Sequence, residues 1–432
     1  MDSIGRPQRP LHLLLVLLLA SACSPSEEGG ARRSADRTPG DPGGDVEEGP
    51  IRPGVEVLLS DSLHLVEGRR VALVTNHTGV DGAGRSSIDL LHEHPGVELV
   101  ALFGPEHGLR GDAGAGDPVE SGTDARTGLP VHSLYSSTRR PPPETLEGVD
   151  ALLFDIQDVG ARYYTYVSTM ARAMEAAGEA GIPFVVLDRP NPIDGVHVQG
   201  TVLDPAFSTF VGLYPVPMRH GMTPGELARL YVGEFGIEVE LHVVPAAGWR
   251  RGMLFDATGL PWIPPSPNMP SLESALHYPG TCLFEGTNLS VGRGTDRAFQ
   301  WIGAPWLDGG ALAANMAEHD LPGVRIEAVT FVPEAPGDGK YDGETVAGVR
   351  FTVTDPGVYD PTRTAVAALL EARRLAGDRW EWLESHFDRL AGTDRLRAQI
   401  DESRSLDEIT GAWAGPLADF RALRRPYLVY GR

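Results

Sequence analysis

Hydrophobic residues occur along this chain in short runs, each closed by polar residues. Four runs are rich in Val, Leu and Phe and are bounded by turn residues; they lie at residues 69–76, 97–108, 149–160 and 182–192. Runs of this kind are typical of strands buried on both faces of a parallel sheet. Segments with a helical pattern lie at residues 86–94, 168–181 and 223–235. This alternation predicts βαβ units and an α/β fold with a Rossmann-like, mostly parallel sheet.

The helix expected at residues 168–181 has recognisable end signals. Ser168 or Thr169 is expected to cap its first turn, because a hydroxyl can accept a hydrogen bond from a free backbone N–H. Gly178 or Gly181 is expected to end it, since glycine readily adopts the left-handed conformation found after a last turn.

Polar residues close each predicted strand. In open α/β sheets the ligand site lies outside the carboxyl ends of the strands, so we expect these residues to gather along one rim. They are Asn76, His77, Glu106, His107, Asp155, Gln157, Asp158, Asp188, Arg189 and Asn191.

The pattern changes after about residue 240. Residues 259–306 are rich in proline and turn residues, 323–335 and 346–355 alternate like half-exposed strands, and 361–377 and 380–392 have the pattern of amphipathic helices. A smaller α+β domain is therefore expected to follow the sheet domain, with the site in the cleft between them.

The first 50 residues have a different composition. A basic start, an apolar run and small residues lead to Cys23 in the sequence ASAC, which resembles a bacterial lipobox. Residues 1–23 thus predict a signal peptide with lipidation at Cys23, and a plain signal peptide cut nearby is the alternative. Residues 24–50 hold Gly, Pro, Ser and charge, as in a disordered tether. Residues 51–277 and 278–432 are then the expected N-terminal catalytic and C-terminal domains.

Composition limits the partners. The chain has 432 residues, 41% of them hydrophobic and 22% charged, which is ordinary for a globular protein. Its formal net charge of −22 argues against binding to nucleic acid or anionic lipid. We expect the protein to be exported, on the periplasmic or extracellular face, and to touch a membrane only through a lipid anchor.

Glu106 and His107 stand where an apolar run ends and a glycine-rich loop begins. A carboxylic acid there can act as a general acid or base if burial raises its pKa. His107 can orient it or contact a substrate. The alternatives are a carboxylate that orders the loop and a packed imidazole.

Three further stretches concentrate polar side chains. Residues 154–166 place carboxylates beside an arginine and three tyrosines, which suits either an ion pair or a sugar-binding surface. Residues 187–195 form a proline turn, and 284–296 form a glycine-rich loop in which Arg293 can clamp an anion.

No motif in the chain requires a metal or a cofactor. The sequence lacks a G-x-S-x-G elbow, a Walker loop and an H-E-x-x-H pair. Residues 338–343 have acidic residues and glycines at a spacing similar to that of a calcium-binding loop. Lys340 occupies a ligand position there, which argues against calcium binding.

Seven stretches resemble the exo-β-N-acetylmuramidase (NamZ-type) family from about residue 52 to the C-terminus. They are VTNHTGV, FGPEHGLRG, DARTGLPVHSLY, FDIQDVGARYYTY, DRPNPIDG, residues 265–306 and RRPYLVY. The chain departs from the family pattern at Ala298, where proline is frequent, and at Val346, where cysteine is frequent. These departures concern local packing or substrate preference more than the type of reaction.

The resemblance implies an exo-acting glycosidase that releases terminal N-acetylmuramic acid from the non-reducing end of peptidoglycan fragments. It implies Glu106 as the catalytic acid, with His107 beside it in the same motif. The resemblance also gives candidates for substrate binding, each of which is assigned less specifically than Glu106. They are Asn76, Asp155, Asp158, Arg162, Tyr164, Asp188, Asn191, Glu285, Asn288 and Arg293.

The residues leave parts of the mechanism open. Arg162 or Arg293 can bind the lactyl carboxylate of muramic acid. Asp155, Asp158, Asp188 or Glu285 can be a second carboxylate, or the substrate's acetamido group can act as nucleophile. A non-catalytic receptor for cell-wall fragments and a hydrolase of an ester or amide bond remain alternatives.

Overall fold

The computed structural model describes residues 50–109, 120–135 and 138–431. The predicted signal peptide with Cys23, and the expected tether up to residue 49, lie outside these ranges. Within them, no helix combines the length and the apolar character that a membrane span requires.

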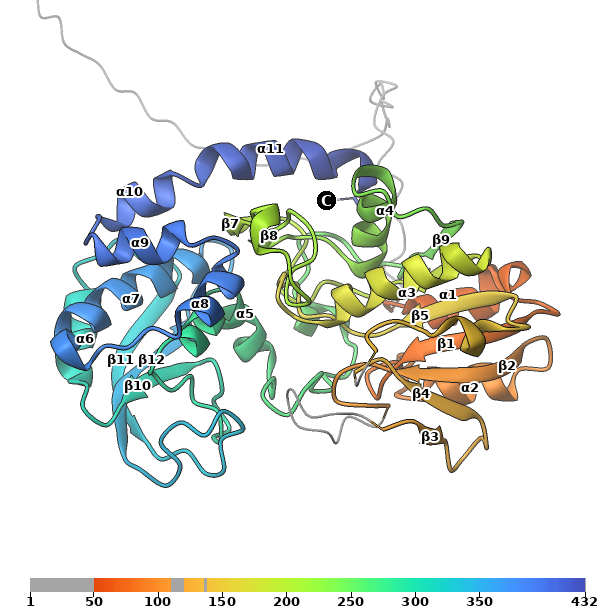
Figure 1. Ribbon diagram of the computed structural model, residues 1–432, viewed down its shortest axis with the longest axis horizontal. Coiled ribbons are helices and arrows are strands. Elements are labelled where there is room, and N and C mark those ends of the chain that lie inside the picture. Colours follow the sequence, from red (N-terminus) through yellow and green to blue (C-terminus); the bar gives the residue numbers. More distant parts are fainter. Residues whose placement is uncertain (1–49, 110–119, 136–137, 432) are drawn as a thin grey trace, which may run out of the picture. The chain divides into compact units, whose positions relative to one another are not determined.

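A seven-stranded sheet forms the N-terminal half of the described chain (Figure 1). Its strand order is β3-β4-β2-β1-β5-β6-β9, and only β3 pairs antiparallel. The four predicted strands and the mostly parallel sheet are confirmed. The strands are β1 (Arg70–Thr75), β2 (Glu98–Gly104), β3 (Gly122–Thr123), β4 (Pro130–Ser133), β5 (Ala151–Asp155), β6 (Phe184–Leu187) and β9 (Leu241–Val244).

Both faces of this sheet are buried, which explains its continuous apolar runs. On β5, Leu152 and Phe154 join a large core with α3 and α4, whereas Ala151 and Leu153 join a smaller core with α1 and α2. The four helices are α1 (Gly54–Asp61), α2 (Ser87–Glu93), α3 (Tyr166–Ala180) and α4 (Pro224–Glu234).

Helix α3 begins earlier than its sequence signals predict. Thr165 is the N-cap residue, not Ser168 or Thr169, and its hydroxyl makes no capping bond. The Thr165 hydroxyl donates instead to the carboxylate of Glu106, 2.5 Å away. The predicted end is confirmed at Gly181, whose φ of 70° suits glycine.

A three-stranded antiparallel sheet, order β10-β12-β11, follows in the C-terminal half, so the predicted α+β character is confirmed. The hairpin β7 (Gln199–Val202) and β8 (Pro217–Arg219) precedes it. The remaining elements are β10 (Trp301–Ala304), β11 (Val324–Phe331), β12 (Val346–Val353), α5 (Leu272–Thr281), α6 (Gly309–Met316), α7 (Pro361–Ala376), α8 (Glu384–Ala391), α9 (Arg395–Asp401), α10 (Leu406–Gly411) and α11 (Ala414–Arg424).

The helix expected at residues 380–392 is shorter than predicted. Its first residues lie beside another segment: Trp382 bridges to Thr287, and the Leu383 N–H donates to the Gly286 carbonyl at 2.9 Å. Helix α8 therefore starts only at Glu384. The boundary expected between residues 277 and 278 stays a prediction, because the large core includes residues from both sides of it.

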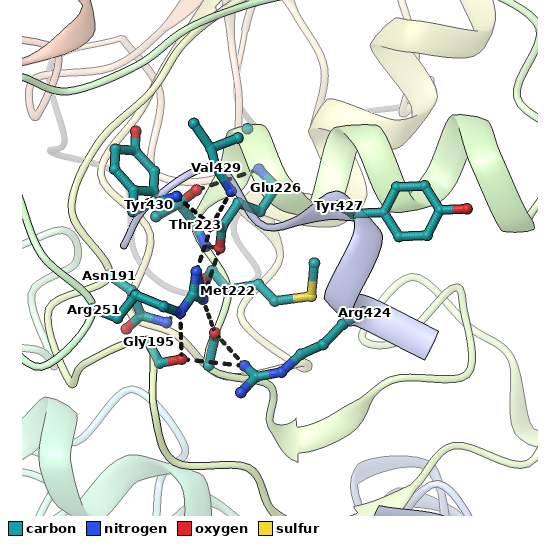
Figure 2. Close-up of polar contacts among 12 residues, drawn as sticks. Asn191, Gly195, Met222, Thr223, Glu226, Arg251, Arg424, Tyr427, Val429 and Tyr430 are labelled. Carbon is teal, nitrogen blue, oxygen red and sulfur yellow. Dashed lines mark hydrogen bonds and ion pairs between the residues drawn. The ribbon is translucent and has the colours of Figure 1, made fainter. Parts of the chain in front are cut away.

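The chain ends against the N-terminal half, where α11 leads back to α4 (Figure 1). Figure 2 shows the contact: Glu226 pairs with Arg251 and accepts the Val429 N–H at 2.8 Å. Arg424 donates to the backbone carbonyls of Gly195 and His220. Glu226 also closes a capping box with Thr223 at the start of α4.

Replacing Glu226 by Gln is expected to lower the free energy of unfolding by about 3–5 kcal/mol, because it leaves the Arg251 guanidinium buried without its counter-charge. Glu402→Gln is the matched control. It breaks an exposed pair with Arg404 and is expected to cost less than about 1 kcal/mol. Urea unfolding of both variants is the measurement, and equal midpoints would contradict a structural role for the buried pair.

Candidate functional site

A pocket of about 130 Å³ lies where β2 ends and α3 begins. Residues from both expected domains line it. Five of the predicted site residues are among them: Glu106, His107, Tyr164, Glu285 and Arg293. The pocket also contains residues not singled out from the sequence, among them Tyr135, Thr165, Ser266, Asn268, Tyr278, Phe299 and His386.

A tight turn presents Glu106 to this pocket. The Gly108 N–H donates to the Pro105 carbonyl at 2.9 Å, which folds the chain back directly after β2. His107 occupies the left-handed region with φ 70°, a conformation that is uncommon for a residue with a side chain. Strained backbone of this kind is concentrated at functional sites. Glu106 is half-buried, whereas His107 is buried.

Glu285 and Arg293 form an ion pair on the C-terminal side of the pocket. The Arg293 Nε donates to Glu285 Oε1 at 2.7 Å, and its Nη2 contacts the same oxygen. Burial by itself raises the pKa of Glu285, but Arg293, with smaller contributions from His386 and Lys340, brings the pKa below its usual value. Glu285 is thus an ionised carboxylate facing the pocket.

The only lysine of the chain supports the loop that carries Glu285. Lys340 Nζ donates to the backbone carbonyls of Thr287 and Leu289 at 2.7 and 3.0 Å, and lies 3.3 Å from those of Phe284 and Glu285. Burial lowers the pKa of this ammonium group. A compact ammonium can donate to several converging carbonyls, which the planar guanidinium of arginine cannot do in the same way. A lone lysine in an arginine-rich chain was the sequence signal for this role.

Arg162 is not at the pocket surface. Its side chain is buried, and it donates to the carbonyls of Thr201, Val216 and Leu390 at 2.7–2.9 Å. Burial lowers the pKa of Arg162 to about 10. These contacts correct the expectation of substrate binding, because both Nη atoms donate to the backbone and Arg162 does not line the pocket.

Three other candidates at strand ends hold local structure. Asp155 forms a bidentate ion pair with Arg189, at 2.5 and 3.0 Å. Asp188 accepts from the hydroxyls of Thr223 and Tyr430, and burial raises its pKa to about 6. Asn191 fixes the proline turn through the Ile193 N–H. The ion-pair and turn interpretations account for these contacts, and none of the three lines the pocket.

Asn76, Asp158 and Asn288 do not line the pocket either. Asn76 orders its own turn, and Asn288 binds the backbone of the segment before α8. Burial raises the pKa of Asp158 to about 7, a value suited to a general acid. The Asp158 carboxyl is buried away from the pocket, and the hydrogen bond that it accepts from the Gly160 N–H lowers the pKa, so we attribute the upward shift to burial alone.

Histidine, cysteine and carboxylate side chains form no metal-binding group in the part of the chain that the structure describes.

Comparisons with known proteins agree with the resemblance in the sequence. Residues 71–273 match the N-terminal model, and residues 276–430 the C-terminal model, of exo-β-N-acetylmuramidase NamZ. A curated relative from Bacillus subtilis (strain 168), peptidoglycan β-N-acetylmuramidase NamZ, is 46% identical over 381 residues, covering 88% of this chain and 91% of the relative.

Two solved structures from Bacteroides fragilis NCTC 9343, both described as DUF1343 family proteins, share the fold. The first has a TM-score of 0.82 and 38% identity and covers 88% of this chain and 99% of that one. The second has a TM-score of 0.71 and 31% identity, with 89% and 99% covered. The paired models and the identity over most of both chains establish that this chain belongs to the exo-β-N-acetylmuramidase NamZ family.

Proposed function

We propose that this glycosidase releases terminal N-acetylmuramic acid from the non-reducing end of peptidoglycan fragments, with Glu106 as its general acid and base. The observation that carries the proposal is a pocket in which Glu106 and Glu285 both face the same space. The curated relative, named as a peptidoglycan β-N-acetylmuramidase, supports the substrate class.

The two carboxylates differ in their surroundings, as the acid and its partner in a glycosidase must. Glu106 stands at the end of β2 and accepts from the Thr165 hydroxyl, and Glu285 lies on the other side of the pocket in an ion pair with Arg293. We assign Glu106 to proton transfer at the glycosidic oxygen. Of the four candidates for a second carboxylate, Glu285 is the one that lines this pocket.

Aromatic side chains give the pocket a surface for a sugar ring. Tyr278 packs edge-on against Phe299, with 4.7 Å between ring centroids, and against Tyr164, with 5.7 Å between them. Tyrosine combines an apolar face with a hydroxyl, so it can stack on a pyranose and hydrogen-bond to it.

We also propose that the protein is exported and anchored by a lipid on Cys23, where it would meet cell-wall fragments. The support is the sequence of the first 23 residues. A Cys23→Ala variant expressed in the native host is expected to move from the membrane fraction to the soluble fraction. Unchanged membrane association would argue for a plain signal peptide or another anchor.

Replacing Glu106 by Gln is expected to reduce kcat for a chromogenic N-acetylmuramide by roughly 100-fold or more, because the amide cannot transfer the proton. Release of N-acetylmuramic acid from a muramyl-glucosamine disaccharide should fall in parallel. Glu402→Gln, outside the pocket, serves as the control and is expected to retain activity. Tight binding of both substrates without release by the wild type would instead favour the receptor.

Lys340→Arg is expected to lower kcat/KM roughly 10- to 100-fold through displacement of the Glu285 loop, although the charge is kept. Kinetics on the same muramide, with circular dichroism as the test of folding, is the measurement. A folded variant with wild-type kcat/KM would show that the loop does not need the ammonium.

A further inference from the structure

The lactyl carboxylate of muramic acid needs a cation that the sequence candidates do not supply. Arg162 does not line the pocket and both its Nη atoms donate to backbone carbonyls, and Arg293 is bound to Glu285. A carboxylate entering the pocket would have to displace one of these contacts. Another positive group at the pocket is therefore the better partner.

Arg389 lies at the edge of the pocket on α8, directly before Leu390, which lines it. Its Nη2 is hydrogen-bonded to Nδ1 of His386, a second lining residue. Its Nε is buried and has no hydrogen-bond partner among the described residues. A buried N–H without an acceptor points to a ligand or water that completes the site.

A second arginine stands beside the same edge. The Arg139 guanidinium lies 5.1 Å from the ring centroid of Tyr135, a lining residue, and 4.4 Å from that of Phe210. Burial, followed by the charge of Glu106, raises the pKa of Tyr135 to about 12, while Arg139 and Arg389 both act in the opposite direction. Both guanidinium charges are therefore close to the Tyr135 hydroxyl.

Neither arginine forms an ion pair with a carboxylate of the described ranges, although many arginines of this acidic chain do. Glu106 stands near the same Tyr135 hydroxyl, but two guanidinium groups outside any ion pair of the described ranges favour an incoming anion at this edge of a protein with net charge −22. A guanidinium matches the two oxygens of a carboxylate, so an organic carboxylate is the ligand that this edge fits.

We propose that Arg389, assisted by Arg139, binds the lactyl carboxylate of the terminal N-acetylmuramic acid. The proposal rests on the muramidase function proposed above. It makes this edge the element that distinguishes N-acetylmuramic acid from sugars without a free carboxylate, because N-acetylglucosamine has the same ring without the lactyl group.

Binding measured by titration calorimetry tests this subsite without requiring turnover. The wild type is expected to bind N-acetylmuramic acid at least about tenfold more tightly than its lactyl carboxamide, as a charge-assisted bond implies. Arg389→Gln should abolish this preference, and Arg389→Lys, which keeps the charge, should retain part of it. Arg139→Gln should weaken it less.

Arg395→Gln is the matched control, since Arg395 is exposed at the start of α9 and does not line the pocket. Equal wild-type affinity for the acid and the carboxamide, no binding of either, or a preference that survives in Arg389→Gln would overturn the proposal. Failure of the muramidase function is a separate result: no sugar is released by the wild type, whatever its binding preference.

Discussion

The buried guanidinium of Arg162 is the contact on which the two sides of the pocket depend. It donates to Thr201 on β7, to Val216 before β8 and to Leu390 on α8. Its neighbour Tyr163 and its partner Leu390 both line the pocket. Moving this charge out of water is costly, and the three charge-assisted bonds to carbonyls offset that cost only while all three segments stay together.

The C-terminal segment adds a second constraint of the same kind. Glu226 and Arg251 are buried together, and the backbone of Val429 completes the acceptor set of Glu226 (Figure 2). Tyr430 extends the contact to Asp188 at the end of β6. Residues at the end of the chain thus stabilise the strand ends of the first sheet, which gives the C-terminal stretch RRPYLVY a structural purpose.

The charges around the pocket form a consistent system. Lys340 holds the loop of Glu285, Arg293 pairs with this carboxylate, and Glu106 accepts from the Thr165 hydroxyl. Arg389 and Arg139 are the cations without a carboxylate partner in the described ranges at this edge. Glu106 and Glu285 have different surroundings, as the two carboxylates of a glycosidase do. The arginines at the pocket edge can in addition attract the carboxylate of an acidic sugar.

The sequence by itself determined the parallel sheet, the α+β character of the second half and the place of Glu106 after β2. These features follow from the local order of apolar, polar and turn-forming residues, which the sequence shows directly. The family motifs could be identified for the same reason, because each is a short continuous stretch of sequence. Only the tertiary structure decided which charged residues face the pocket. Arg162 finds Leu390 at a separation of 228 positions, and Thr165 finds Glu106 instead of capping its helix. The partner of a polar side chain depends on segments brought together by folding, so a local pattern cannot separate a buried ion pair from a binding residue.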